Sequence, residues 1–364
     1  MPQEVERTGG MPGETAPRHN HRRPVLGYLC RAFPPAVAVG LGMRPLRSTR
    51  ELDGEMARRG EKLVRPDVCP AVKAVLGAVR YGMGQAGRVD VWAGLATCDG
   101  TRRLFGELEG MTGKPVIPLY LPSTRTEEAE DYYAKEMKAF AKTAVDRGLA
   151  EGWDGEAAQA FEAAFRRTAS VLRDLALSGE VDPILLASSL SLFSSAEPAM
   201  LGQRIAELSD GNDAGGWSPR YRVAVMEVPG APGDDLLADA LSGRGAGMVA
   251  LGCGALWGVP EEPAPEVPSP RNLARDWFRS ALCARSRPNN ALFDSIRESL
   301  TETGAAGLVV STLQLCDLWF TERLRLRREM PVPVLVLDRD LSPAGREMAR
   351  NRLDAFLDSL EAMR

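Results

Sequence analysis

Cysteines are the residues of this chain whose positions suggest chemistry. The 364-residue sequence contains six of them: Cys30, Cys69, Cys98, Cys253, Cys283 and Cys316. No two have Cys-x-x-Cys spacing, so local spacing alone does not identify a site. Cys98, Cys253 and Cys316 each follow an apolar run that predicts a strand, and Cys69 precedes a predicted helix. Ligands collect at the carboxyl ends of parallel strands, so a shared metal site and simple packing of buried thiols are both open.

The small number of histidines limits the kinds of catalytic and metal-binding site that this chain can contain. The only two histidines, His19 and His21, lie in the polar N-terminal stretch. A Ser/His/Asp triad, a histidine zinc site and a histidine general base are therefore excluded from the predicted folded body. Any metal must be held by cysteine or carboxylate, and soft thiolates favour iron–sulfur or zinc. Six cysteines in so long a chain do not predict a disulfide scaffold.

Composition predicts a globular protein of ordinary type. Hydrophobic residues make up 44% and charged residues 26%, and the formal net charge is −4. We expect neither a nucleic-acid nor a membrane partner, because both usually require a basic patch. Apolar runs such as 36–42 are far shorter than the roughly 20 residues of a membrane span. Residues 1–22 lack the apolar core of a secretory signal, so they predict a disordered tail and a cytoplasmic protein.

Strands and helices are predicted to alternate in two units. The first unit contains a strand, helix and strand within 25–47, a helix at 71–81 and strands at 88–93 and 114–119. The second contains strands at 221–228, 247–252, 307–311 and 332–337, with helices at 234–241, 290–303, 318–329 and 346–363. Apolar strands that do not alternate in polarity indicate parallel sheets covered on both faces, hence an α/β fold.

The predicted domain organisation follows from these units. Residues 1–22 form the tail, 23–125 an N-terminal α/β lobe, 126–215 a helical segment with helical apolar spacing, and 216–364 a C-terminal α/β lobe. The Gly-rich loop at 210–219 is the expected boundary. The pattern Gly82-x-Gly84-x-x-Gly87 follows a predicted helix and precedes a strand, the reverse of the dinucleotide-binding order, so we do not interpret it as a nucleotide site.

Several segments resemble one enzyme family. The stretch Gly27-Tyr28-Leu29-Cys30-Arg31-Ala32-Phe33-Pro34, followed by a Gly- and Pro-bounded turn at 40–45, is similar to the N-terminal signature of the 2-hydroxyacyl-CoA dehydratase family. That family includes the D-component of 2-hydroxyglutaryl-CoA dehydratase and the subunits of ATP-dependent benzoyl-CoA reductase. The segments around Cys69, Cys98 and Cys316 resemble its three cluster-ligand segments in the same order. Residues 333–340, near the end of the chain, also resemble the family pattern. The resemblance covers about residues 24–362.

The resemblance implies a fold and a cofactor. Members have two flavodoxin-like lobes with a helical portion, and a 4Fe-4S cluster held by three cysteines with one iron open to exchange. Carried over to this chain, the metal and cofactor ligands are Cys69, Cys98 and Cys316. Cys30 and Cys253 match positions that are often cysteine without being ligands, and we interpret them, with Cys283, as packing residues. A larger fused cluster stays open, since six cysteines are present.

The family also implies an activity. The expected function is the iron–sulfur subunit of a 2-hydroxyacyl-CoA dehydratase-like lyase or benzoyl-CoA reductase-like oxidoreductase. A separate ATP-dependent activator would supply one low-potential electron, which passes to an acyl-CoA thioester or to a homologous sister subunit in a heterodimer or homodimer. The resulting thioester ketyl radical acidifies an otherwise inert β-hydrogen. No Walker A sequence is present, and no catalytic acid or base is identified.

Two departures from the family pattern support a different hypothesis. Ala36 stands where the family usually has a glutamate, and Leu251-Gly252-Cys253-Gly254 lacks the usual acidic residues. Without those carboxylates the chain could be a non-catalytic iron–sulfur protein, serving electron relay or assembly. A third interpretation is an α/β protein whose cysteines are all structural. Arg102, Arg103, Arg285 and Arg287 are candidates to face CoA phosphates or to be ordinary charged surface.

Overall fold

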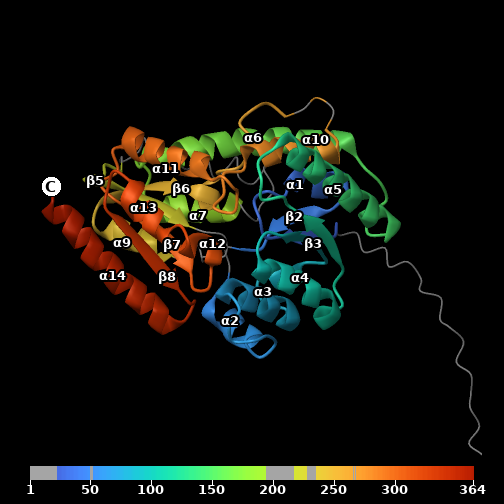
Figure 1. Ribbon diagram of the computed structural model, residues 1–364, viewed down its shortest axis with the longest axis horizontal. Coiled ribbons are helices and arrows are strands. Elements are labelled where there is room, and N and C mark those ends of the chain that lie inside the picture. Colours follow the sequence, from blue (N-terminus) through green and yellow to red (C-terminus); the bar gives the residue numbers. More distant parts are fainter. Residues whose placement is uncertain (1–22, 50–51, 194–216, 228–234, 265, 267) are drawn as a thin grey trace, which may run out of the picture.

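Two four-stranded sheets, every strand pair of which is parallel, form the two lobes of the molecule (Figure 1). The computed structural model describes residues 23–49, 52–193, 217–227, 235–264, 266 and 268–364. The predicted α/β class with two lobes is confirmed. The predicted tail, with both histidines, and most of the predicted boundary loop at 210–219 lie outside the described residues.

The first lobe has the strand order β2-β1-β3-β4. Its strands are β1 (Val25–Tyr28), β2 (Arg44–Arg47), β3 (Val91–Ala96) and β4 (Val116–Tyr120). Helices α2 (Gly54–Gly60), α3 (Pro70–Tyr81) and α4 (Asp99–Thr112) cover one face, and α1 (Pro35–Gly40) and α5 (Glu127–Asp146) cover the other. The order reverses between β1 and β3, which is where doubly wound sheets open a crevice at their carboxyl edge.

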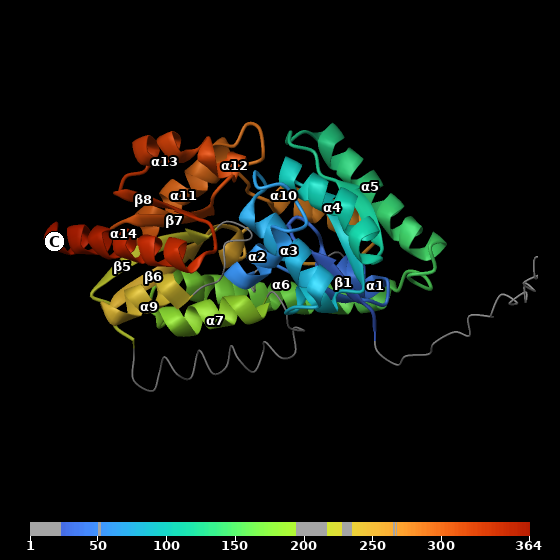
Figure 2. The same cartoon turned by 90° about the horizontal axis from the view of Figure 1, so that it is seen from below.

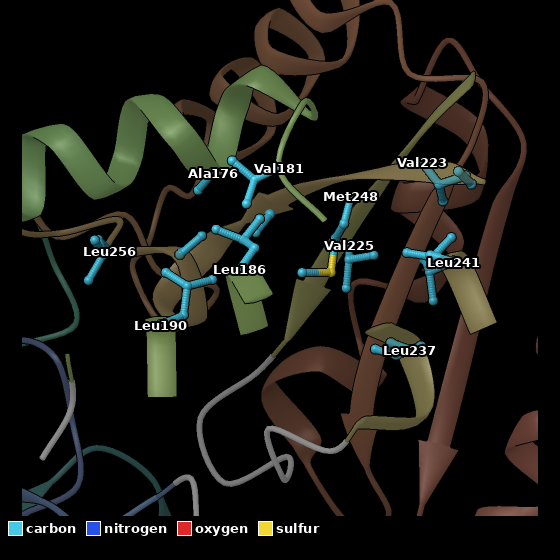
Figure 3. Packing of buried hydrophobic residues seen from close by; sticks show 14 of the residues in the cluster. Ala176, Val181, Leu186, Leu190, Val223, Val225, Leu237, Leu241, Met248 and Leu256 are labelled. Carbon is cyan, nitrogen blue, oxygen red and sulfur yellow. The ribbon is translucent and has the colours of Figure 1, made fainter. Parts of the chain in front are cut away.

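The second lobe repeats this plan, with the order β6-β5-β7-β8. Its strands are β5 (Tyr221–Glu227), β6 (Ala246–Leu251), β7 (Leu308–Leu313) and β8 (Val334–Arg339). Helices α11 (Asn290–Thr303), α12 (Asp317–Phe320) and α13 (Arg323–Glu329) cover one face, and α7 (Pro183–Phe193), α9 (Asp235–Gly243) and α14 (Pro343–Ala362) cover the other. Figure 3 shows Leu186 and Leu190 of α7 packed near Val225 and Met248 of the sheet.

Two helices join the lobes (Figures 1 and 2). Helix α6 (Gly155–Ser178) contacts α1 of the first lobe and β6 of the second. Helix α10 (Pro270–Ser280) packs along α5, and its Leu273 and Phe278 lie in the core of the first lobe. The predicted lobe 216–364 therefore does not pack as one unit. The predicted segment 126–215 is likewise divided, because α5 belongs to the first core and α7 to the second.

A buried polar network fastens α6 to α10. The Glu162 carboxylate, fully buried, accepts hydrogen bonds from Arg166 Nε at 2.8 Å and Trp277 Nε1 at 2.7 Å. Arg166 also pairs with Asp276 at 3.1 Å. Burial raises the pKa of Glu162, and the charge of Arg166 opposes that rise. Removing one member of such a buried pair leaves an uncompensated charge, so the network fixes how these helices meet.

Three local expectations need correction. The predicted helix 318–329 is two helices, α12 and α13, and Glu322, which lies at the break, accepts from Asn289 Nδ2 at 2.9 Å. Helix α2 was not predicted, although Asp53 caps it by accepting from the Met56 backbone at 2.7 Å. Helix α10, which begins at Pro270 with Ser269 as its cap, was not predicted either.

Candidate metal centre

The three cysteines expected as cluster ligands come together between the lobes. Cys98 follows β3 of the first lobe, Cys316 follows β7 of the second, and Cys69 precedes α3. Their thiols are close enough to interact electrostatically, Cys316 with both others and Cys69 with Cys98. A Cβ placed on Gly100 would lie 3.7 Å from Cys98 Sγ and 3.9 Å from Cys69 Cβ. Residues far apart in sequence therefore share one location at the carboxyl edges of both sheets.

Each of these cysteines also begins a helix. Cys69 is the N-cap of α3, Cys98 of α4 and Cys316 of α12. At Cys98 the Sγ accepts from the Thr101 backbone N–H at 3.4 Å, and Thr101 Oγ1 accepts from the Cys98 backbone N–H at 3.0 Å. A helix N-terminus favours negative charge and lowers the cost of a thiolate. The local structure therefore directs positive partial charge at the shared location.

Burial opposes the helix N-termini, because it disfavours the negatively charged thiolate form of these cysteines. It raises the pKa of Cys316 to about 11 and also raises the pKa of Cys69, while backbone N–H groups oppose the rise at both. As free thiols both are protonated at neutral pH, so metal binding must release protons. Cys98 is exposed, which gives the group one side open to solvent. Across the ranges that the structure describes, no three His, Cys, Asp or Glu side chains converge tightly enough to hold a single metal ion.

The other three cysteines line one cavity next to this location. Cys30 follows β1, Cys253 follows β6, and Cys283 lies in the loop between α10 and α11. Thr97, the neighbour of Cys98, lines the same cavity. Sequence reasoning treated these cysteines as separate packing residues. The strand-end positions of Cys30 and Cys253 were a signal for their meeting, whereas nothing local marked Cys283, because α10 carries it across from the second lobe.

One arginine, Arg285, lies beside thiols of both groups of cysteines. Arg285 donates to the backbone carbonyls of Pro122, at 2.7 Å, and of Leu121, and it interacts electrostatically with Cys30, Cys98 and Cys283. Burial lowers the pKa of this guanidinium. Arg285 lies beside the thiols and directs its N–H groups at backbone carbonyls. An arginine that binds a CoA phosphate would instead direct its N–H groups at that phosphate.

Other arginines hold the lobes in register or remain at the surface. Arg31 and Arg47 of the first lobe donate to the Cys253 carbonyl of the second, at 3.4 and 3.2 Å. Arg287 pairs with Glu322 at 3.2 Å, and the exposed Arg102 pairs with Asp99 at 3.5 Å. Both lobes thus meet at the backbone of Cys253.

Comparison with known families decides the identity of the chain. The family described as 2-hydroxyglutaryl-CoA dehydratase, D-component, matches residues 30–360. The chain belongs to this D-component family. The predicted resemblance is therefore confirmed, and the matched range includes all six cysteines.

Other comparisons add little to the D-component assignment. No curated protein matches the chain. Two solved structures of the SBP FpvC from Pseudomonas aeruginosa, one with Mn2+ and one with Ni2+, are each 14% identical and cover 94% of this chain. They are covered over 100% and 98% of their own length, but the TM-score of 0.23 is too low to indicate a shared fold. In the described part of the chain, no helix combines the length and apolar character of a membrane span.

Proposed function

We propose that this chain is the iron–sulfur subunit of a 2-hydroxyacyl-CoA dehydratase-like or benzoyl-CoA reductase-like enzyme. Cys69, Cys98 and Cys316 would hold a 4Fe-4S cluster. The observation that carries the proposal is the meeting of these three thiols, each at the start of a helix, between the two lobes of a D-component family member. When bound, the cluster would supply one low-potential electron to an acyl-CoA thioester.

The residues present fit such a group. Soft thiolate donors without histidine or carboxylate suit an iron–sulfur cluster. A four-iron cluster is wider than an ion, so its cysteines need to be near one another without converging on a point. The N–H of Thr101 and the three helix starts offset negative charge on the sulfurs. Three ligands rather than four would leave one iron position for exchange.

The orientation of the site supports the proposed partners. Cys98 is the exposed member of the group, so this side is open to an acyl-CoA, to the cluster of a sister subunit or to an activator protein. Cys69 and Cys316 are half-buried and lie on the inner side of the group, away from solvent. Removing water from the inner side strengthens the effect of nearby dipoles on a negatively charged group.

Substitution of Cys98 tests the proposal. We expect anaerobically purified Cys98→Ala to lose about four irons and four sulfides per chain relative to the unchanged protein. Its circular dichroism should be retained, because Cys98 is exposed and only its cap to α4 is lost. Thr101→Ser is the matched control, since it keeps the hydroxyl that accepts from Cys98, and it should retain its iron. A Cys98→Ala protein with its full iron would refute the proposed ligand set.

One observation favours a second candidate, a non-catalytic electron-relay or assembly protein. Ala36, where the family usually has glutamate, is fully buried in the apolar core of the first lobe. No carboxylate from that position reaches a substrate. Calorimetric titration of the purified protein with a 2-hydroxyacyl-CoA and with benzoyl-CoA separates the candidates: saturable binding of either excludes the relay interpretation, and absence of binding to both supports it.

A further inference from the structure

A second cavity lies at the amino-terminal edge of the second sheet. Its volume is about 560 Å³, within the range of roughly 300–1,000 Å³ that small-molecule sites occupy. Residues 217–222, which lead into β5, form part of its lining. Strand β5 (Tyr221–Glu227) spans about 20 Å at roughly 3.3 Å per residue. Because Cys316 follows the carboxyl end of the neighbouring parallel strand β7, the cavity is separate from the candidate metal centre.

Segments far apart in the sequence form this cavity. Glu180 follows α6, Ala306 precedes β7, and Arg364 follows α14 and lies beside β5 (Figure 1). The Ala306 backbone N–H donates to the Arg222 carbonyl at 2.8 Å. Gly179 has a left-handed backbone, and a Cβ there would stand 2.8 Å from Arg222 Cδ. Glycine at this turn therefore leaves room for Arg222, whose guanidinium pairs with Glu180 at 3.0 Å.

Positive charge predominates in the described lining of this cavity. Three cations and one anion, which sum to a formal charge of +2, are present: Arg220, Arg222, Arg364 and Glu180. The carboxylate of Glu180 pairs with Arg222. In the part of the chain that the structure describes, neither Arg220 nor Arg364 has a carboxylate within ion-pair distance. Arg364 instead lies over the Tyr221 ring, 5.0 Å from its centre. Two guanidinium groups are therefore available to an anion.

Two buried N–H groups of the lining residues have no acceptor. Across the described residues, neither Trp217 Nε1 nor Arg222 Nε has a hydrogen-bond partner. Buried donors without a partner are costly and uncommon in folded proteins. Indole and guanidinium groups can only donate, so an occupant that satisfies them must accept hydrogen bonds. The charge and the donors together therefore favour an anionic acceptor.

We infer that this cavity binds a small organic phosphate monoester. Such a phosphate carries about −1.5 to −2 charges near neutral pH, which matches the +2 of the described lining, whereas a monocarboxylate carries a single negative charge. Guanidinium groups bind phosphate oxygens through paired, parallel hydrogen bonds. The cavity is much larger than one phosphate group, and Trp217 offers the organic part an aromatic surface. Such binding is independent of the proposed iron–sulfur chemistry.

Calorimetric titration of the full chain with phenyl phosphate, in a buffer free of phosphate, tests the inference. We expect one saturable site per chain. Benzoate, which has the same ring but a single charge, should bind about tenfold more weakly or worse. Arg220→Gln should weaken the binding of phenyl phosphate by about tenfold or more, because a hydrogen bond between two charged groups is lost. Glu180→Gln should strengthen it, because the carboxylate that competes for Arg222 is removed.

An exposed arginine of the first lobe provides the matched control. Arg80→Gln removes the same charge from the last turn of α3, outside the cavity, and should bind phenyl phosphate as the unchanged protein does. The side chain of Arg220 is also exposed, so Arg220→Gln should fold, which circular dichroism checks. If it does not fold, Arg364→Gln replaces it, because Arg364 lines the same cavity and is exposed.

The affinities of the variants decide the outcome. Weaker binding by Arg220→Gln, stronger binding by Glu180→Gln and unchanged binding by Arg80→Gln would support the phosphate site. Absence of saturable binding, or equal affinities of Arg220→Gln and Arg80→Gln, would overturn it. Benzoate binding as tightly as phenyl phosphate would refute the phosphate assignment, and inorganic phosphate binding as tightly would refute the organic part. Iron content does not enter these titrations, so their result is separate from that of the proposed function.

Discussion

Substitution of Gly77 tests how the helix that begins at Cys69 is positioned. Gly77 lies in α3 where it crosses α2, and an added Cβ would stand 2.0 Å from the Met56 carbonyl oxygen and 2.9 Å from the Gly60 nitrogen. Both are backbone atoms that cannot rotate away, so the helices must separate by about 1 Å or more. Overpacking of this kind costs about 1–3 kcal/mol, against a gain of about 1 kcal/mol in helix propensity. We expect Gly77→Ala to lose about 1 kcal/mol, the middle of the net range.

A second helical glycine provides the control. Gly110 lies in α4 with no atom within 4 Å of its Cβ position, so Gly110→Ala should gain about 1 kcal/mol. Urea unfolding followed by far-ultraviolet circular dichroism should therefore separate the variants by about 2 kcal/mol. Because the shift of α3 also moves Cys69, Gly77→Ala should bind less iron than Gly110→Ala. Equal unfolding midpoints for the two variants would refute the close crossing of α2 and α3.

Three further predictions concern the interior and the exposed thiol. Arg166→Met leaves the buried Glu162 carboxylate without its cation and should lower the free energy of unfolding in urea by about 3–5 kcal/mol. The control, exposed Arg58→Ala, should lower it by under about 1 kcal/mol. Similar losses for the two variants would contradict the buried network. Burial raises the pKa of Glu162 in the folded protein above its unfolded-state pKa of 4.5. The stability that this raised pKa contributes is therefore fully present below pH 4.5 and is lost as the pH rises through the pKa of the folded state. Glu162→Gln should therefore flatten the fall of the unfolding midpoint above pH 4.5, and an unchanged slope would contradict the raised pKa. Iodoacetamide should label exposed Cys98 before Cys283 in peptide mass spectrometry, and the reverse order would be inconsistent with their burial.

The sequence predicted the elements that carry strong local signals. Strands such as β5 and β6 are wholly apolar at their centres, and α11 has the predicted bounds, with Gly304 ending it in a left-handed conformation. The predicted grouping of Cys69, Cys98 and Cys316 came from the family resemblance, and the structure brings these residues together. Their use as ligands stays a prediction.

The long-range packing of the helices could not be predicted from the sequence. An amphipathic helix shows which of its faces is buried but not which sheet buries it, so nothing local indicated that α10 joins the first lobe. That crossing is what carries Cys283 to Cys30, so the second group of cysteines could not be predicted either. Similarly, α12 and α13 were predicted as one helix, and Glu322 at the break contacts Asn289, which lies 33 residues away in the sequence.

Metal analysis of the anaerobically purified protein tests the central claim most directly. Iron, acid-labile sulfide and the visible spectrum should be measured on the unchanged chain beside Cys98→Ala. We expect a brown protein in which Cys98→Ala removes about four irons per chain. A colourless, iron-free protein that resists reconstitution with iron and sulfide would contradict it, and would leave a two-lobed member of the D-component family whose cysteines are structural.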